Sequence, residues 1–362
     1  MKIDFANLAL QHQLYKEEIE SAIHEVISKC NFIMGEEVEL LERELEAFTG
    51  AKHAITCASG TDALLLALMA LGIKAGDEVI TTPFTFIATA EMIALLGAKP
   101  LFVDIEEESY NLDVTQLEKK ITPKTKAILP VHLYGQPSDL KEIMEVAKAH
   151  DLRVVIDGAQ SFGSTYEGVS DSALGDISCT SFFPAKPLGC YGDGGALFTS
   201  NEELAAKIKS LRIHGQTQRY HHQYIGIGGR LDTIQAAVLR VKLRHYSKDL
   251  AQRVEVAKRY SLALSSKEGI ILPQIKPNRT SAFAQYSIRV KERPRVQARL
   301  KEAGVPTAVH YPMPLHLQGC FAYLGHQKGD FPVAEQVSEE ILSLPMNPYV
   351  SEEEMEYIGG CF

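Results

Sequence analysis

Residues 127–157 read AILPVHLYGQPSDLKEIMEVAKAHDLRVVID. Two strand-like runs, Ala127–Val131 and Arg153–Asp157, flank a segment with helical periodicity, Leu140–His150. A strand that is apolar throughout is typical of a sheet buried on both faces, and a helix between two strands makes them parallel. The same alternation precedes this stretch, with strands expected at 53–57, 78–81 and 100–104 and helices at 61–71, 87–96 and 113–120. The chain is therefore predicted to have an α/β fold with a mainly parallel sheet.

The pattern changes outside this region. Helices are expected at the N-terminus (17–29 and 36–48) and later at 202–211, 233–246 and 250–264, and two strands (177–183 and 196–199) bracket a glycine-rich loop. Beyond about residue 265, strands at 286–290 and 308–310 mix with helices at 294–303 and 333–341. A chain of 362 residues suits two domains. We expect a large domain over residues 1–247, including the N-terminal helices, and a smaller α/β domain over 248–362.

Composition restricts the class of protein. Hydrophobic residues make up 45% and charged residues 23%, which is typical of a soluble globular chain. The net charge of −9 argues against nonspecific nucleic-acid binding. The longest apolar stretch, Ala63–Ile73, is too short to cross a membrane, and an acidic residue interrupts Met1–Phe5 where a signal peptide would stay apolar. Six cysteines without metal-ligand spacing predict reduced thiols, no metal and a cytoplasmic protein.

Lys186 is an isolated lysine among apolar, aromatic and small residues, in TSFFPAKPLGCYGDGGA (residues 180–196). An amine with such neighbours loses hydration, so its pKa falls and it becomes a nucleophile toward carbonyl groups. The ordinary alternative is a lysine that extends to solvent beside a glycine-rich turn.

Three further groups follow expected strands, where ligands bind in open α/β sheets. Gly60 and Thr61 begin an apolar helix and could bind a phosphate, or simply form a helix cap. Asp157 ends a strand, with Gln160 three residues later; the acid could pair with a protonated ring nitrogen or be a turn residue. Phe86 could stack on a flat cofactor or fill the core.

Together these groups supply what pyridoxal 5'-phosphate requires. They are an amine that reacts with an aldehyde, a phosphate site, a carboxylate for the pyridine nitrogen and a stacking ring. The cofactor then acts as an electron sink, and the freed amine of Lys186 is placed to move a proton.

The chain resembles the DegT/DnrJ group of nucleotide-sugar aminotransferases, within the aspartate-aminotransferase superfamily of fold type I. The matching stretches keep the family's order and spacing over nearly the whole chain: GTDAL (60–64), FTFIATA (84–90), DGAQSFG (157–163), SFFPAK (181–186), GDGG (192–195) and RLDTIQAA (230–237).

The resemblance implies a role for each matching residue. Lys186 corresponds to the lysine that forms a Schiff base with the cofactor, and Asp157 to the partner of the pyridine nitrogen. Gln160 corresponds to the residue near the ring hydroxyl, and Phe86 to the stacking ring. Gly60, Thr61 and Ser181 correspond to phosphate ligands. The resemblance also implies a homodimer in which the segment before Arg230 completes the partner's site.

A narrower resemblance concerns the substrate. The stretches RYHH (219–222), RLDT (230–233) and PTAVHYP (306–312) are similar to aminotransferases that act on UDP-2-acetamido-2-deoxy-3-oxo-D-glucuronate, in bacterial O-antigen synthesis. This implies L-glutamate as amino donor and a substrate with a diphosphate and a carboxylate. Arg230, His310 and Tyr311 are the expected substrate-binding residues. The 219–222 segment is otherwise a polar surface loop, since no carboxylate or cysteine stands at metal-ligand spacing.

Two positions depart from the family pattern. Gly228 replaces a common asparagine, and Ala185 a common serine, so two hydrogen-bonding side chains near the cofactor are lost. Each loss is worth about 0.5–1.5 kcal/mol, and we expect weaker cofactor binding than in a Gly228→Asn variant.

Four other functions compete with this one. A dTDP-linked 3- or 4-keto-6-deoxyhexose could be the sugar. A sugar dehydratase of the same fold would carry histidine in place of Lys186. A non-catalytic homologue would not need Lys186, Asp157 and Gln160 together. A nicotinamide enzyme would need G-x-G-x-x-G spacing, which GDGG (192–195) lacks.

Overall fold

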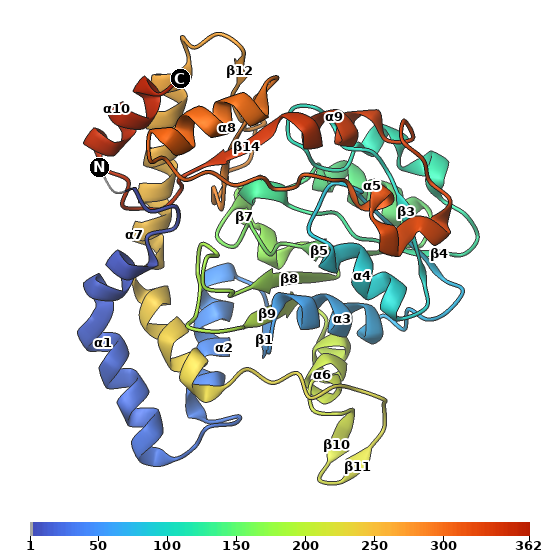
Figure 1. Ribbon diagram of the computed structural model, residues 1–362. Coiled ribbons are helices and arrows are strands. Elements are labelled where there is room, and N and C mark those ends of the chain that lie inside the picture. The colour runs from blue at the N-terminus through green and yellow to red at the C-terminus, as the bar shows by residue number, and fades with distance from the viewer. Residues whose placement is uncertain (1–2) are drawn as a thin grey trace.

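A seven-stranded sheet forms the centre of the molecule in the computed structural model, which describes residues 3–362 (Figure 1). Only β9 runs antiparallel to its neighbours among these strands, so the predicted mainly parallel α/β sheet is confirmed. The order across the sheet is β1 (His53–Cys57), β9 (Gly195–Thr199), β8 (Ile177–Ser181), β5 (Arg153–Asp157), β4 (Thr125–Ile128), β2 (Glu78–Thr81) and β3 (Lys99–Phe102).

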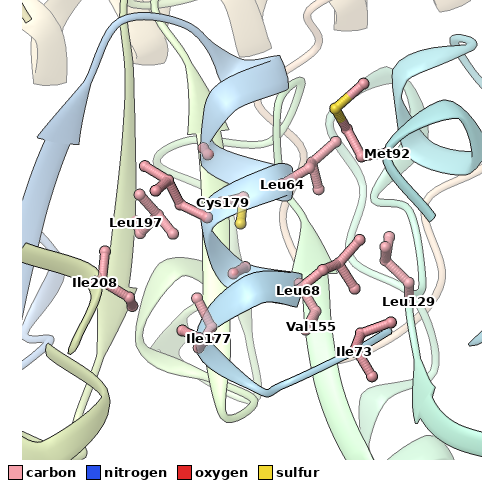
Figure 2. Packing of buried hydrophobic residues seen from close by; sticks show 14 of the residues in the cluster. Leu64, Leu68, Ile73, Met92, Leu129, Val155, Ile177, Cys179, Leu197 and Ile208 are labelled. Atoms are coloured by element: carbon pink, nitrogen blue, oxygen red, sulfur yellow. The ribbon is translucent and has the colours of Figure 1, made fainter. Parts of the chain in front are cut away.

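Helices cover both faces of this sheet because side chains alternate along each strand. On β5, Val155 packs in the cluster that includes α3 (Gly60–Ala70), whereas Val154 and Ile156 pack with α5 (Leu140–Ala149). Figure 2 shows α3 placing Leu64 and Leu68 against the strands. The first face also carries residues of α4 (Ala88–Leu95) and α6 (Glu202–Leu211), and the second face those of α2 (Glu36–Thr49).

The C-terminal part is built on a three-stranded antiparallel sheet with its own core cluster. That cluster also contains Ile3 and the last turns of α7 (Thr233–Leu264), the long helix that joins the two parts. The elements are β12 (Ile270–Ile271), β13 (Tyr286–Val290), β14 (Ile341–Leu344), α8 (Arg293–Glu302), α9 (Pro332–Glu340) and α10 (Glu352–Gly360).

Helix α7 differs from the expectation of two helices over 233–246 and 250–264. The polar residues between them do not break the helix, because Asp249 is buried and its carboxylate accepts hydrogen bonds from Tyr15 (2.8 Å) and Tyr349 (3.1 Å). Tyr15 belongs to α1 (Leu8–Lys29), which packs along α7 and begins nine residues before its expected start. The expected domain boundary at 247/248 lies inside α7, and the division stays a prediction.

Two more expected elements are wrong. Residues 113–120 form two short 3₁₀ turns, Val114–Gln116 and Glu118–Lys120, because the Asp113 carboxylate bonds Thr115 and Gln116 and competes with an α-helix. Residues 308–310 make only an isolated bridge, Ala308 to Ser343, since the next acceptor, the His310 carbonyl, takes a side-chain hydroxyl instead. The short pairs β6 (Thr165–Tyr166) with β7 (Val169–Ser170) and β10 (Gln216–Gln218) with β11 (His221–His222) were not expected.

Candidate active site

The expected site residues converge at one edge of the sheet. The expected cofactor-binding residues lie at or just after the carboxyl ends of β1, β2, β5 and β8, which all run in the same direction. Ligands bind at this edge of open α/β sheets because the strand-to-helix turns leave polar groups free there. The topology therefore places Gly60, Phe86, Asp157 and Lys186 around one region, although they are up to 126 positions apart (186 − 60).

The turn from β1 into α3 has the features of an anion site. Ser59 is the N-cap, and its Oγ accepts the backbone N–H of Asp62 at 3.0 Å. A Cβ added to Gly60 would lie 2.6 Å from the Cβ of Ser181, at the end of β8. Two of the expected phosphate ligands are therefore in close contact, at the N-terminus of an 11-residue helix whose dipole favours a negative charge.

This contact leads to a test of Gly60. A Gly60→Ala variant is expected to lose about 1–3 kcal/mol of stability and to bind pyridoxal phosphate more weakly, because the new methyl group forces the α3 turn away from Ser181. Urea unfolding and cofactor titration measure the two effects. Gly319→Ala is the control, since its added Cβ meets no atom within 4 Å. Equal behaviour of the two variants would contradict the prediction.

Asp157 is held as an acceptor at the end of β5. Its side chain is 5% exposed; Oδ2 accepts the Thr89 hydroxyl at 2.7 Å and Oδ1 accepts the Ala159 N–H at 3.2 Å. Thr89 in turn lies 3.0 Å from the Thr85 hydroxyl. Donors on both oxygens stabilise the ionised carboxylate and fix its direction. The carboxylate therefore suits the N–H of a protonated ring.

Lys186 lies on the tight loop that follows β8. Its backbone N–H donates to the Phe183 carbonyl at 2.8 Å, which closes a turn around the lysine. The residue is only half-buried, but loss of hydration lowers the pKa of its amine, and the nearby Asp157 carboxylate opposes part of that shift. A lower pKa leaves a larger fraction of the amine unprotonated near neutral pH, and only the unprotonated amine can attack a carbonyl or accept a proton.

Gln160 is oriented by two neighbours. Its Oε1 accepts the Tyr134 N–H at 2.6 Å, so its amide N–H groups face the other way, and one of them donates to the Tyr311 hydroxyl at 3.2 Å. The Tyr134 hydroxyl donates to the His310 carbonyl. Burial raises the pKa of Tyr311, with a further contribution from Asp157, so its hydroxyl keeps its proton near neutral pH. These contacts link the central sheet to the segment at 310–311.

His310 lies half-buried in the same region, with Nδ1 2.8 Å from the Ser343 hydroxyl. Burial, and secondly the charge of Lys186, lower the pKa of His310 from 6.5 to about 4. The ring is therefore neutral at physiological pH and can offer hydrogen bonds but no charge.

The lowered pKa of His310 predicts an acid-sensitive contribution to folding. Unfolded chains bind a proton on this histidine below pH 6.5, whereas the folded protein does so only near pH 4. The contribution of the neutral His310 ring to the free energy of unfolding is therefore complete above pH 6.5 and is lost as the pH falls from 6.5 toward 4. Between pH 7 and pH 5 the loss amounts to about 2 kcal/mol. Urea unfolding of the cofactor-free protein should show this loss, and a His310→Gln variant should lack it. Equal pH dependence in both proteins would refute it.

Phe86 and Arg230 lie at the open side of the region. The Phe86 ring is 54% exposed and lies 6.2 Å from the Tyr311 ring, so one face is free for stacking. Arg230 is half-buried at the base of the β10–β11 hairpin, where the Gly229 carbonyl accepts the Ala58 N–H at 3.0 Å. A Cβ added to Gly228 would lie 3.1 Å from two ring atoms of His214, and the effect of this glycine on cofactor affinity stays a prediction.

These residues fit pyridoxal phosphate. The helix N-terminus beside Ser181 suits a dianionic phosphate, and the Asp157 carboxylate suits the N–H of the pyridine ring. Gln160 offers N–H donors, and Lys186 offers an amine with a lowered pKa. Residues 3–362 contain no group of three or more histidine, cysteine or acidic side chains that could hold a metal ion. Across the same residues no helix is long and apolar enough to cross a membrane.

Sequence reasoning missed two contributors, Thr89 and Tyr134. Thr89 bonds Asp157, and Tyr134 bonds both Gln160 and the His310 carbonyl. A signal existed for the first: Thr85 and Thr89 place two hydroxyl groups in the turn after β2 and the first turn of an apolar helix, where ligands bind in open α/β sheets. Nothing in the sequence marked Tyr134, because its role depends on a backbone N–H and on a carbonyl 176 residues away.

Known proteins place the chain in a family. The model of the DegT/DnrJ/EryC1/StrS aminotransferase family matches residues 13–362. A Pseudomonas aeruginosa protein named UDP-2-acetamido-2-deoxy-3-oxo-D-glucuronate aminotransferase is 49% identical over 348 residues, covering 96% of each chain.

Solved structures agree with this assignment. DesV from S. venezuelae has a TM-score of 0.98 and 37% identity, covering 99% of this chain and 97% of its own. NtdA from Bacillus subtilis, solved with bound cofactor PMP, has a TM-score of 0.92 and 31% identity, covering 99% and 84%. The chain belongs to the DegT/DnrJ/EryC1/StrS aminotransferase family, whose pyridoxal phosphate cofactor its site fits.

Proposed function

We propose that this enzyme transfers an amino group from L-glutamate to C3 of UDP-2-acetamido-2-deoxy-3-oxo-D-glucuronate, in the synthesis of O-antigen sugars. The observation that carries the choice of sugar is the 49% identity, over 96% of both chains, to the Pseudomonas aeruginosa enzyme named for that substrate. Pyridoxal phosphate, when bound, supplies the carbonyl that carries the amino group and the ring that delocalises electrons.

Lys186 serves as the covalent anchor and as the base in this proposal. Its lowered pKa leaves more of the amine neutral, so with cofactor bound the nitrogen could accept a proton from the carbon of the amino donor and deliver it to the cofactor within the same half-reaction. In the second half it would move a proton in the opposite direction, to C3 of the sugar. The closed turn from Phe183 to Lys186 limits where that nitrogen can move. Proton transfer needs such restraint because its rate depends on the distance and direction of approach.

Asp157 and Gln160 orient the cofactor. Asp157, fixed by Thr89 and Ala159, accepts the pyridine N–H and keeps that nitrogen protonated. Gln160 would offer an amide N–H to the ring hydroxyl, because its oxygen is occupied by the Tyr134 N–H. Gly60, Thr61 and Ser181 would bind the phosphate, and Phe86 would cover one face of the ring.

Arg230, His310 and Tyr311 bind the sugar nucleotide. Tyr311, which keeps its proton, and neutral His310 supply hydrogen bonds to sugar oxygens. Arg230 supplies a positive charge for the diphosphate or the uronate carboxylate.

A homodimer is part of this proposal. Around Lys186, Phe86 (54%) and Phe183 (52%) are exposed, and the hairpin segment carries Tyr220 (77%) and Ile225 (92%). Figure 1 shows the β10–β11 hairpin extending away from the body of the molecule. Exposed apolar side chains beside a site and on a protruding hairpin support a second copy that covers them. The cytoplasm, where nucleotide sugars are available, is the proposed location.

The sugar is tested in the reverse direction, where the substrate is a stable amino sugar. Purified enzyme is mixed with the UDP-linked 3-amino uronate and 2-oxoglutarate, and in parallel with dTDP-linked 3- and 4-amino-6-deoxyhexoses. We expect turnover of the uronate, measured as glutamate, at a kcat/KM at least about 100-fold above the others. Absence of turnover with the uronate would overturn the proposed substrate. Absence of any glutamate-dependent change in visible absorption would favour a non-catalytic homologue.

A further inference from the structure

Helix α7 places a buried lysine against the loop that carries Lys186. Lys242 is 3% exposed, and its Nζ donates to the Gly189 carbonyl at 2.7 Å. The same nitrogen lies 4.6 Å from the centre of the Tyr191 ring. Both contacts are to residues within five positions of Lys186 along the chain. The proposed chemistry gives Lys242 no role, so its place in the fold needs another explanation.

The loop is closed on itself by backbone hydrogen bonds. Phe182 donates to the Gly194 carbonyl at 2.7 Å, and Cys190 donates to the Phe182 carbonyl at 2.8 Å. A Cβ added to Gly189 would lie 2.7 Å from the Phe183 carbonyl oxygen, so the two sides of the loop are in close contact there. Such a loop has a definite internal shape. Its position in the site, however, depends on contacts with the elements around it.

Two side chains of α7 make those contacts. Gln235 Oε1 accepts the Tyr191 N–H at 2.8 Å, and Lys242 binds the Gly189 carbonyl. Positions 235 and 242 are seven residues apart, so they lie on one face of the helix about two turns from each other. They hold the loop at two backbone groups, one through an acceptor and one through a donor. A third contact reaches Tyr191 from α1, where His12 Nδ1 is 2.8 Å from its hydroxyl.

The amine of Lys242 matters for the directional hydrogen bond that it donates to the Gly189 carbonyl, and not for the volume that it fills. Burial lowers the pKa of Lys242 to about 8, and burial raises the pKa of the neighbouring Cys190 thiol to about 11, so no thiolate balances the charge near neutral pH. Asp249, two turns further along α7, adds attraction through space. An apolar side chain would fill the same volume without desolvating an amine. What only the amine provides is a charge-assisted hydrogen bond to one carbonyl.

We propose that Lys242 is a positioning residue for Lys186: it fixes the Gly189 carbonyl, with Gln235 fixing the next part of the loop, and so sets where the Lys186 amine meets cofactor and substrate. This inference rests on the aminotransferase chemistry and is independent of which sugar is used. It predicts that removing the Lys242 amine loosens the loop and slows the chemical step while substrate binding changes little.

The test compares Lys242→Met, which keeps the length of the side chain, with Lys242→Arg and with Lys248→Met, an exposed lysine on the same helix. Hydrogen–deuterium exchange is followed over residues 183–194 in the cofactor-free full-length protein, and kcat and KM are measured in the loaded enzyme. For Lys242→Met we expect exchange about 10-fold faster in that segment alone and kcat about 10-fold lower with KM within about twofold. Lys242→Arg should restore most of the exchange protection over residues 183–194 and most of kcat. Lys248→Met should match the parent in exchange and in kcat.

Results that differ from these expectations would contradict the proposed role of Lys242. Unchanged exchange over 183–194, or exchange that rises equally across the whole chain, would show that Lys242 serves general stability. An unchanged kcat, or an arginine variant no better than methionine, would show that the donor does not matter. The exchange experiment uses neither substrate, so its failure is distinguishable from a wrong assignment of the sugar.

Discussion

A Lys186→Met variant is expected to lose covalent attachment of pyridoxal phosphate and to have kcat reduced by about 10⁴-fold or more. The magnitude follows because the proposed function gives one side chain two tasks, as nucleophile toward the cofactor and as the group that moves the proton, and acid–base catalysis alone contributes up to about 10⁴-fold. Methionine has a similar length and no desolvation cost at this half-buried position, so the fold should be kept.

Two measurements check this result. Borohydride reduction followed by peptide mass spectrometry should locate the cofactor on Lys186 in the parent and find none in the variant. Steady-state assays give kcat. Lys209→Met, at an exposed position of α6, is the matched control and should retain both properties. A Lys186→Met enzyme with kcat within about 100-fold of the parent would contradict the assignment.

An Asp157→Asn variant is expected to lower kcat by about 10³-fold and to leave the fold in place. The substitution removes the negative charge that keeps the pyridine nitrogen protonated, and preorganised charges of this kind supply several kcal/mol in other enzymes. Asparagine has the same shape. Its amide group can still meet the Ala159 N–H through its oxygen, while the Thr89 hydroxyl rotates to accept from its nitrogen.

Thr89→Val serves as the graded comparison for Asp157→Asn. It removes one donor to the carboxylate, 2.7 Å away, and leaves the charge, so kcat should fall only about 10-fold. Steady-state kinetics and the visible spectrum of the bound cofactor, which reports the protonation of the ring, measure both variants. If Asp157→Asn stays within about 10-fold of the parent, the carboxylate does not hold the ring nitrogen in the proposed way.

Local patterns explain why much of the fold was predictable. Strands such as β1, β2 and β5 have the expected bounds, because short apolar segments between turns can be recognised within five residues. The mainly parallel sheet followed from their alternation with helices. That sheet in turn brought the expected ligands to one edge, since parallel strands end on the same side. The family resemblance then gave each expected side chain a role.

Apart from the expected helix over 113–120, which the neighbouring Asp113 carboxylate prevents, the errors come from contacts between distant residues. The polar residues near Asp249 suggested a break in α7, but the hydroxyl groups of Tyr15 and Tyr349 satisfy that buried carboxylate and the helix continues. The roles of Thr89 and Tyr134 follow only from their hydrogen bonds to Asp157 and Gln160, 68 and 26 residues away along the chain. None of these pairings has a regular spacing that a pattern could detect.

The sequence by itself determined the α/β architecture, the isolated lysine at 186, the acid at the end of β5 and the glycine turn at α3, because periodicity and turn chemistry act over a few neighbouring residues. Tertiary structure alone decided which groups orient these residues. Three contacts join segments more than 20 residues apart: the close approach of Gly60 to Ser181, the hydrogen bond that orients the Gln160 amide, and the hydrogen bond from Lys242 to the Gly189 carbonyl. Short-range and directional forces set such contacts, and they exist only once the chain has folded.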